Sequence, residues 1–392
     1  MYPLDILVVG AGVFGASAAL SLVKRGHRVR LLEQGQVPHP LAASTDLSKA
    51  VRGDYGRDSF YTELHRACWP LWQRSPFFHP TGMMFLSRRP LSPGSFEYES
   101  VQVQERLGGT AERLRPVALA ARFPAWNAAV YPDGYFNPQA GWVESARFVQ
   151  DLVEQAVALG VRRLEDCPVE ALDEVGGRVA GVLLRGGERL RADLVVCALG
   201  AFSPLLMPWL GERLKAVGQP VFHFRPADPR PFEGRVFPVW AADISSTGWY
   251  GFPANADGLV KVARHGPGRV QSADAPREVD ADEEHRFRAF LRESLPSLAD
   301  APVESTRLCL YTDTFDGDFL IDRDPDRPGL VVATGGSGHA LKFAPLLGEI
   351  IADAALGVDS RWRPRFAWRA APHPGSPGAE AARFTGTDTE RH

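Results

Sequence analysis

The stretch that most constrains the fold spans residues 4–35, LDILVVGAGVFGASAALSLVKRGHRVRLLEQG. An apolar run over residues 4–9 leads directly into a glycine-rich turn, GAGVFG at 10–15, and a helical pattern continues to about Lys24. A second strand-like run ends at Glu33, roughly 20 residues beyond the glycines. Strand, glycine turn, helix, strand and terminal acid occur in the order of a βαβ unit that binds a dinucleotide.

The residues of this unit have separate physical roles. Gly10 permits the tight turn, Gly12 lets a pyrophosphate approach the backbone, and Gly15 lets the helix pack close to the strand. The N–H groups at the helix start face the phosphates, and Glu33 supplies an acceptor for a ribose hydroxyl. The motif leaves open whether the dinucleotide is NAD or FAD. A glycine-rich turn in an unrelated α/β protein is the alternative interpretation.

Composition narrows the class of protein. The 392 residues carry a formal net charge of −3, so charge gives no argument for binding nucleic acid or an anionic membrane. No apolar run approaches the roughly 20 residues that span a bilayer, and we expect no signal peptide because the N-terminus enters the first strand directly. The four cysteines are scattered without a CxxC pair, which argues against a metal site or redox dithiol and fits a reducing cytoplasm.

The rest of the chain alternates between α/β segments and β-rich inserts. Three strands joined by Gly-Gly turns are expected over residues 169–192, and the apolar strand at 194–199 is expected to return beside the first strand. Aromatic residues alternate with Pro and Gly over 217–265, which predicts antiparallel strands of a second sheet. A buried strand at 330–334 leads into a second glycine turn and a helix that runs to about Ala355.

The predicted fold class is therefore α/β, in an α+β arrangement of two domains. A Rossmann-like dinucleotide-binding domain, discontinuous in sequence, carries an inserted antiparallel β-sheet domain for the substrate. We assign residues 1–80, 144–212 and 308–370 to the first domain, 81–143 and 213–307 to the second, and 371–392 to a flexible tail.

Three segments near the C-terminus resemble one flavoenzyme family. They read RLCLYTDT at 307–314, GDFLID at 317–322 and ATGGSGHALKF at 333–343. They are similar to the signature of FAD-dependent amine oxidases in the D-amino acid oxidase-like superfamily. This group comprises monomeric sarcosine oxidase, N-methyl-tryptophan oxidase, pipecolate and saccharopine oxidases, and fructosyl amino acid oxidases (amadoriases). The resemblance extends from Asp5 to about Trp368, and the sequence DLSK at 46–49 leans toward the amadoriase and saccharopine oxidase branch.

The resemblance implies FAD and an oxidase reaction. Such enzymes take hydride from the carbon next to the nitrogen of an N-substituted (secondary) amino acid, which gives an imine, and O₂ becomes H₂O₂. The implied partners are a small amine or amino acid and O₂, and the implied state is a cytoplasmic monomer or weak dimer. Two alternatives remain open. One is a flavin dehydrogenase that passes electrons to another acceptor, and the other is a non-catalytic flavin-binding redox sensor.

The resemblance also assigns individual catalytic residues. Cys309 matches a cysteine that is covalently linked to the flavin, although a buried structural cysteine would look the same in the sequence. Lys261 matches a lysine that promotes O₂ reduction. It must point away from the apolar face formed by Val260 and Val262, but the pattern leaves open whether that side is solvent or active site. Tyr250 and His265 match further active-site positions.

Of three other cations, two are assigned to the substrate carboxylate and the third, Lys49, to the catalytic residues. Arg52 and Lys342 match a pair that binds the substrate carboxylate, with a surface cation as the alternative for each. Lys49 stands where sarcosine oxidase has an arginine, so sarcosine itself becomes a doubtful substrate. Asp46 is expected either to orient Lys49 or to cap a short turn.

The residues that the motifs together place at the cofactor come from the whole chain. They are Gly10, Gly12, Val13, Phe14, Gly15, Glu33, Gln34, Ser44, Lys49, Val169, Ala198, Gly200, Cys309, Gly336, Gly338, His339 and Lys342.

Overall fold

The opening stretch forms the predicted βαβ unit. In the computed structural model, which describes residues 2–370, β1 (Asp5–Val9), α1 (Val13–Lys24) and β2 (Arg28–Leu32) follow one another. Gly10 has φ +98°, and a Cβ there would lie 2.6 Å from the carbonyl oxygen of Ala198. A Cβ on Gly15 would lie 1.7 Å from the carbonyl oxygen of Gly10. Both positions therefore require glycine. The predicted tail, 371–392, lies outside the described residues.

A six-stranded sheet is built around β1. Its order is β20-β21-β13-β1-β2-β9, and all neighbours are parallel except β20 and β21. The predicted return of the strand at 194–199 beside the first strand is confirmed, since Val8 pairs with Val196. The added strands are β9 (Arg162–Leu164), β13 (Leu194–Cys197), β20 (Leu320–Arg323) and β21 (Leu330–Thr334).

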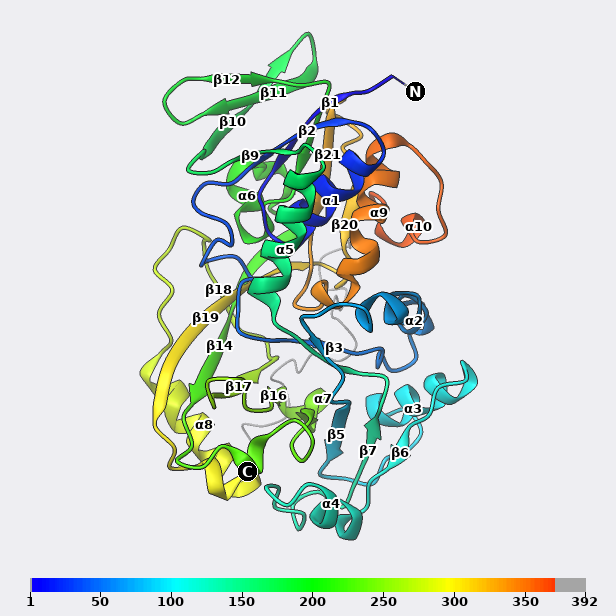
Figure 1. Cartoon of the computed structure of the whole chain (residues 1–392), viewed down its shortest axis with the longest axis vertical. Coiled ribbons are helices and arrows are strands. Elements are labelled where there is room, and N and C mark those ends of the chain that lie inside the picture. The colour runs from blue at the N-terminus through cyan, green and yellow to red at the C-terminus, as the bar shows by residue number, and fades with distance from the viewer. Residues whose placement is uncertain (1, 371–392) are drawn as a thin grey trace.

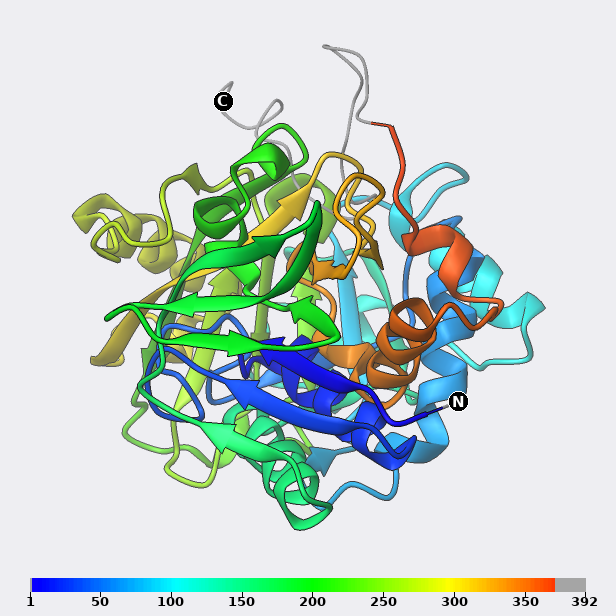
Figure 2. The same ribbon diagram turned by 90° about the horizontal axis from the view of Figure 1, so that it is seen from above.

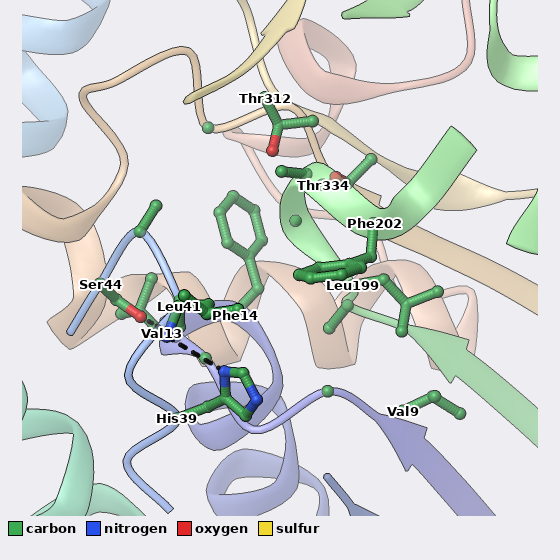
Figure 3. A pocket seen from close by; sticks show the side chains of 18 of the residues that line it. Val9, Val13, Phe14, His39, Leu41, Ser44, Leu199, Phe202, Thr312 and Thr334 are labelled. Atoms are coloured by element: carbon green, nitrogen blue, oxygen red, sulfur yellow. Dashed lines mark hydrogen bonds between the residues drawn. The ribbon is translucent and has the colours of Figure 1, made fainter. Parts of the chain in front are cut away.

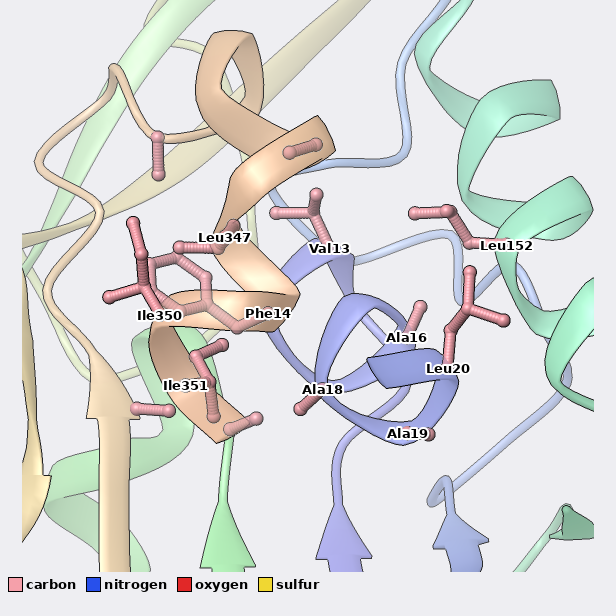
Figure 4. Packing of buried hydrophobic residues seen from close by; sticks show 14 of the residues in the cluster. Val13, Phe14, Ala16, Ala18, Ala19, Leu20, Leu152, Leu347, Ile350 and Ile351 are labelled. Carbon is pink, nitrogen blue, oxygen red and sulfur yellow. The ribbon is translucent and has the colours of Figure 1, made fainter. Parts of the chain in front are cut away.

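Helices cover one face of this sheet and a β-meander covers the other (Figures 1 and 2). On the helical face, α1 lies between α5 (Ser145–Ala158) and α9 (Ala344–Leu356), as Figure 4 shows. The crossing of α1 and α9 is close, because a Cβ on Gly348 would lie 2.2 Å from the carbonyl oxygen of Ser17. The meander on the other face consists of β10 (Val169–Val175), β11 (Arg178–Leu184) and β12 (Arg189–Arg191).

A second, nine-stranded sheet forms the other half of the molecule. Its order is β18-β14-β17-β16-β15-β5-β7-β6, and β19 pairs with β14. The pairs are antiparallel except β15 with β5, which are parallel. The strands are β5 (Met83–Ser87), β6 (Glu112–Arg113), β7 (Asp133–Asn137), β14 (Leu214–Phe224), β15 (Val239–Ala242), β16 (Trp249–Phe252), β17 (Val260–Arg264), β18 (Arg269–Val270) and β19 (Val303–Thr314).

The longest strand pair extends toward the first sheet. β19 pairs with β14 from Thr314 to Val303, so it continues across the boundary placed at residue 307 from the sequence. The division into domains remains a prediction. Helix α8 (Ala281–Ser294) packs on the large sheet, where Phe287 and Phe290 contact Trp249. Trp240 and Trp249 therefore belong to this hydrophobic core.

A small sheet and further helices complete the described residues. The three-stranded sheet has the order β3-β8-β4 and places Lys49 next to Val143. The second glycine turn does not lead straight into a helix as expected. A 3₁₀ turn at Leu341–Phe343 comes first, so Lys342 precedes α9 instead of lying in its first turns. The remaining elements are α2 (Ser59–Trp72), β3 (Lys49–Val51), β4 (Phe78–His79), α3 (Phe96–Arg106), α4 (Pro116–Arg122), β8 (Gly141–Val143), α6 (Ser203–Leu206), α7 (Ile244–Thr247) and α10 (Arg363–Phe366).

Candidate active site

A cavity of about 440 Å³ opens at the carboxyl ends of the parallel strands. Val9 at the end of β1 and Thr334 at the end of β21 line it, as Figure 3 shows. This is the edge at which open α/β sheets bind ligands. Fourteen of the 17 predicted cofactor residues line the cavity: Gly10, Gly12, Val13, Phe14, Glu33, Gln34, Ser44, Lys49, Val169, Ala198, Gly200, Gly336, Gly338 and His339.

The other three predicted cofactor residues lie close behind or beside the cavity. Gly15 packs the helix against the glycine turn. Cys309 is buried, and its Sγ lies 3.8 Å from Lys49 Nζ and 4.0 Å from the carbonyl oxygen of Ala43, two residues that line the cavity. Lys342 lines a second, smaller cavity.

The glycine end of the large cavity suits a pyrophosphate and a ribose. The N-cap of α1 is Gly12, so no side chain covers the helix start from that position, and phosphate oxygens can approach the N–H groups. The hydroxyl of Ser44 accepts a hydrogen bond from the Val13 N–H at 3.2 Å. Glu33 accepts one from the Ala11 N–H at 2.8 Å, so the glycine turn itself fixes this carboxylate at the cavity wall. The residues present therefore fit a dinucleotide.

The second cavity, of about 80 Å³, adjoins the first. The two cavities share Lys49, Tyr311, Gly338, His339 and Leu341. The predicted residues that line the smaller one are Lys49, Arg52, Tyr250, His265, His339, Gly338 and Lys342, and its remaining wall is largely apolar: Ala50, Met83, Phe85, Ala241, Ile244, Phe252 and Leu341. None of the described residues that line it is Asp or Glu.

The two cations assigned to the substrate carboxylate are buried at this cavity. Arg52 donates to the carbonyl oxygen of Asp54, and its guanidinium carbon lies 4.8 Å from the centroid of the Tyr55 ring. Lys342 Nζ donates to the hydroxyl of Tyr55 at 3.2 Å. The surface-cation alternative is wrong for both residues, because each side chain is buried and faces a cavity.

The model of the DAO family, described as FAD dependent oxidoreductase, matches residues 5–354. The chain belongs to this family. The expectations of FAD and of an oxidoreductase are thereby confirmed, and the large cavity is the candidate site for FAD, called the FAD cavity below.

Two curated relatives cover nearly the whole chain. The oxidoreductase is 27% identical over 363 residues to monomeric sarcosine oxidase of Bacillus sp. (strain B-0618), a match that covers 90% of this chain and 92% of the relative. It is 29% identical over 364 residues to N-methyl-L-tryptophan oxidase of Citrobacter koseri, which covers 90% of this chain and 95% of the relative. The predicted family resemblance is confirmed.

Solved structures show the same fold. Amadoriase I from Aspergillus fumigatus, a fructosyl amine: oxygen oxidoreductase, superposes with a TM-score of 0.84 at 24% identity, covering 98% of this chain and 94% of that one. Fructosyl peptide oxidase from E. terrenum gives a TM-score of 0.84 at 22% identity, with 97% and 96% covered. The predicted fold class, a mixed α/β protein of two domains with antiparallel sheets, is confirmed.

Lys261 of the oxidoreductase points into the protein. Its side chain is 2% exposed, and Nζ donates to Asp46 Oδ2 at 2.5 Å and to the carbonyl oxygen of Ser48 at 2.7 Å. Lys49 Nζ lies 3.4 Å from the same Asp46 oxygen. Of the two possibilities for Lys261, the side away from Val260 and Val262 is therefore protein interior. Asp46 pairs with both lysines, so its expected contact with Lys49 is present.

Asp46, Lys49 and Lys261 shift one another's pKa values. Burial raises the pKa of Asp46, but Lys261 and Lys49 outweigh it and hold the pKa well below its usual range. Burial lowers the pKa of Lys261 to about 8, against the opposing effect of Asp46. Burial also lowers the pKa of Lys49, but its electrostatic interactions with Cys309, Asp46 and Tyr250 outweigh burial and hold the pKa above its ordinary value. Near neutral pH the group therefore contains one carboxylate and two ammonium ions.

The tyrosines complete the wall between the cavities. The hydroxyls of Tyr250 and Tyr311 lie 3.2 Å apart, and burial raises the pKa of Tyr250, so its hydroxyl stays protonated at neutral pH. Tyr311 was missed as a site residue. Its position two residues after Cys309 on one strand is a signal for it, since alternate side chains share a face. Tyr55 was also missed, and no sequence pattern links it to Lys342.

The structure describes residues 2–370. Within this range, no three His, Cys, Asp or Glu side chains come together in a way that could hold a metal ion. No helix in the same range is long and apolar enough to cross a membrane.

The Asp46–Lys261 pair leads to a prediction about stability. Asp46→Asn leaves Lys261 buried without its carboxylate, so the free energy of unfolding at pH 7 should fall by about 3–5 kcal/mol in urea denaturation. The decrease in the free energy of unfolding caused by Asp46→Asn should be smaller at pH 9, because Lys261, with a pKa of about 8, is then mostly neutral.

A double variant and a surface control test the cause. Asp46→Asn combined with Lys261→Met should recover part of the loss, since it removes the uncompensated charge. Asp228→Asn, which breaks the exposed pair with Arg230, should be nearly neutral. Equal losses in the single and double variants would contradict the assigned pairing.

Proposed function

We propose that this FAD-dependent oxidoreductase is an oxidase of N-substituted amino acids. The observation that carries the proposal is the small cavity beside the FAD cavity, which combines the buried cations Arg52 and Lys342 with largely apolar walls. An anionic carboxylate and a short apolar group fit such a lining. The names of two relatives, monomeric sarcosine oxidase and N-methyl-L-tryptophan oxidase, support the same class.

The cofactor has a defined task in this proposal. Bound FAD accepts the hydride from the carbon next to the amine nitrogen and delivers the electrons to O₂, giving H₂O₂ and an imine that hydrolyses. The glycine turn at 10–15 and Glu33 hold its pyrophosphate and ribose, and the residues from Gly335 to Lys342 bear on its reactive ring.

The side chains of the small cavity bind and orient the substrate. The planar fork of Arg52 and the ammonium of Lys342 hold the carboxylate, which fixes the amino acid at one end. Tyr250 and Tyr311, whose hydroxyls lie 3.2 Å apart, also line this cavity, and Phe252 and Leu341 keep water away from it.

The cations also act on the substrate amine. Hydride loss from carbon needs a lone pair on nitrogen, so the amine must be neutral. Lys49 lines both cavities and stays charged, and a fixed positive charge there disfavours an ammonium in the cavity. His265 lines the same cavity, with its backbone N–H held by the carbonyl oxygen of Gly248 at 2.7 Å. We assign it a role beside the substrate nitrogen.

Lys261 is assigned to O₂. Reduction of O₂ passes through an anion, and a fixed buried cation stabilises that charge. Asp46 and the carbonyl oxygen of Ser48 hold the ammonium in place, and because Lys49 shares the same carboxylate, the group of three keeps a net positive charge. A buried cation at this position favours O₂ over the alternative of a dehydrogenase with another acceptor. The presence of Arg52, Lys261, Cys309 and Lys342 together argues against a non-catalytic redox sensor.

Cys309 is assigned a covalent bond to FAD. Its sulfur lies beside Lys49 and Ala43, both at the cavity wall. Burial raises the pKa of the Cys197 thiol to about 12, as expected of an unreactive structural cysteine. The cytoplasmic location, the monomeric or weakly dimeric state and the domain boundaries remain predictions from the sequence.

The first test is anaerobic bleaching of the flavin by candidate substrates. The panel contains sarcosine, N-methyl-tryptophan, pipecolate, proline, saccharopine and fructosyl-amino acids, each followed by O₂ and a peroxide assay. At least one N-substituted amino acid should bleach the flavin and yield H₂O₂, and Arg52→Met should raise its KM by about tenfold or more. No bleaching with any member of the panel would reject the proposed function.

The second test concerns covalent attachment. Protein precipitated in acid should keep its yellow colour, because a thioether to Cys309 survives denaturation. Cys309→Ser should release the colour into the supernatant, whereas Cys197→Ser, at another buried cysteine, should not. A colourless pellet from the unaltered protein would refute the bond.

The third test separates the two half-reactions. Lys261→Met should slow flavin reoxidation by O₂ by about 100-fold or more while changing anaerobic reduction far less. In the unaltered enzyme the reoxidation rate should decline as pH rises through about 8, where Lys261 loses its proton. Stopped-flow absorbance measures both rates. Similar slowing of reduction and reoxidation would remove the assigned role.

A further inference from the structure

We propose that Tyr55 is the positioning residue of the carboxylate site, which sets the orientation of both Arg52 and Lys342. The inference rests on the proposed function of those two cations. Tyr55 is buried and lines neither cavity, so it stands behind the cations and acts through them. The structure brings it to them from one side, with its ring toward Arg52 and its hydroxyl toward Lys342.

The tyrosine contacts the two cations in different ways. The guanidinium carbon of Arg52 lies 4.8 Å from the ring centroid, within the range of a cation–π contact. Lys342 Nζ lies 5.3 Å from the same centroid and donates to the hydroxyl at 3.2 Å. Arg52 follows strand β3, whereas Lys342 lies in the 3₁₀ turn before α9. One side chain therefore links cations from distant parts of the chain.

The carbonyl group of Gly317 determines which atom donates in each hydrogen bond that links Lys342, Tyr55 and His339. His339 Nε2 lies 2.9 Å from the carbonyl oxygen of Gly317, which can only accept, so Nε2 carries a proton. In the neutral ring Nδ1 then accepts from the Tyr55 hydroxyl, at 2.9 Å. The Tyr55 oxygen still has a lone pair for Lys342, whose ammonium can only donate. The bonds thus run from Lys342 through Tyr55 and His339 to Gly317.

The Tyr55 ring is itself fixed by its neighbours. It stacks on Tyr61 with centroids 4.8 Å apart and an interplanar angle of 23°, and Phe343 lies 6.0 Å away. The hydroxyl of Tyr61 donates to Asp318 at 2.8 Å, which anchors that ring in turn. A ring held in this way keeps a constant position beside the charged groups of Arg52 and Lys342. Once one N–H of Lys342 points at Tyr55, the directions of the other two are set.

The two contacts can be separated by substitution. Tyr55→Phe keeps the ring under Arg52 and removes the hydrogen bonds of the hydroxyl to Lys342 and to His339. Tyr55→Leu removes both contacts, with the risk of a folding defect, so Tyr55→Phe carries the test and its thermal unfolding is checked first. Lys342→Met gives the background in which the hydroxyl has no ammonium to orient.

The experiment measures binding of a carboxylate that cannot be oxidised. Propionate is titrated into the oxidised holoenzyme and followed by the flavin absorbance, with propionamide as the matched neutral probe. In turnover, the KM and kcat for the best N-substituted amino acid are measured with the same variants. A carboxylate site should prefer propionate to propionamide.

Tyr55→Phe should weaken propionate binding about fivefold to tenfold and leave propionamide within about twofold. It should raise KM by a similar factor with kcat within about twofold, because the lost interaction is uniform binding. In the Lys342→Met background, Tyr55→Phe should change propionate binding by less than about twofold.

Three results would overturn the proposal. One is equal weakening of propionate and propionamide binding, which indicates a general structural role. Another is an undiminished effect of Tyr55→Phe in the Lys342→Met background. The third is equal affinity of the unaltered enzyme for both probes, which would also reject the carboxylate site. The first two leave the proposed function intact, so the two failures are distinguishable.

Discussion

The rest of the site depends on one interaction, the ion pair between the carboxylate of Asp46 and the ammonium of Lys261. It comes from the loop between the βαβ unit and β3, and it reaches Lys261 on a strand of the large sheet. The pair is almost fully buried, and Lys49 shares the same carboxylate oxygen. A buried charge without its partner is costly, so this contact ties the loop before β3 to the large sheet. Lys49, which lines both cavities, has its place set by the same group.

Local sequence patterns predicted the elements of the fold well, because strands and helices follow from short-range periodicity. The βαβ unit and the meander at 169–192 were placed nearly to the residue. Two features were less visible. The segment 131–138 is rich in turn residues but contains β7, since pairing with β5 overrides local preference. The 3₁₀ turn before α9 lies in a glycine-rich stretch, and such a stretch has little periodicity to read.

The candidate site was predictable where it followed a linear motif. Fourteen of the 17 residues predicted for the cofactor line the large cavity, although they make up fewer than half of its lining residues. The contacts between side chains were not predictable, because they join residues far apart in the chain. Asp46 and Lys261 are 215 residues apart, and Lys342 and Tyr55 are 287 apart. The alternation around Lys261 showed which way the lysine faces but not what it faces.

The discontinuous FAD cavity has a consequence for biosynthesis. Its wall includes Val9 from the first strand and Leu341 from the last glycine-rich segment. Synthesis proceeds from the N-terminus. β1 can therefore pair with β2 early, but it can pair with β13 only after residues 194–197 have been made, and β13 can pair with β21 only later still. A ribosome-bound chain that ends before Leu341 cannot present the complete cavity. The candidate FAD site is therefore complete only after residue 341 has been synthesised and β21 has joined the sheet.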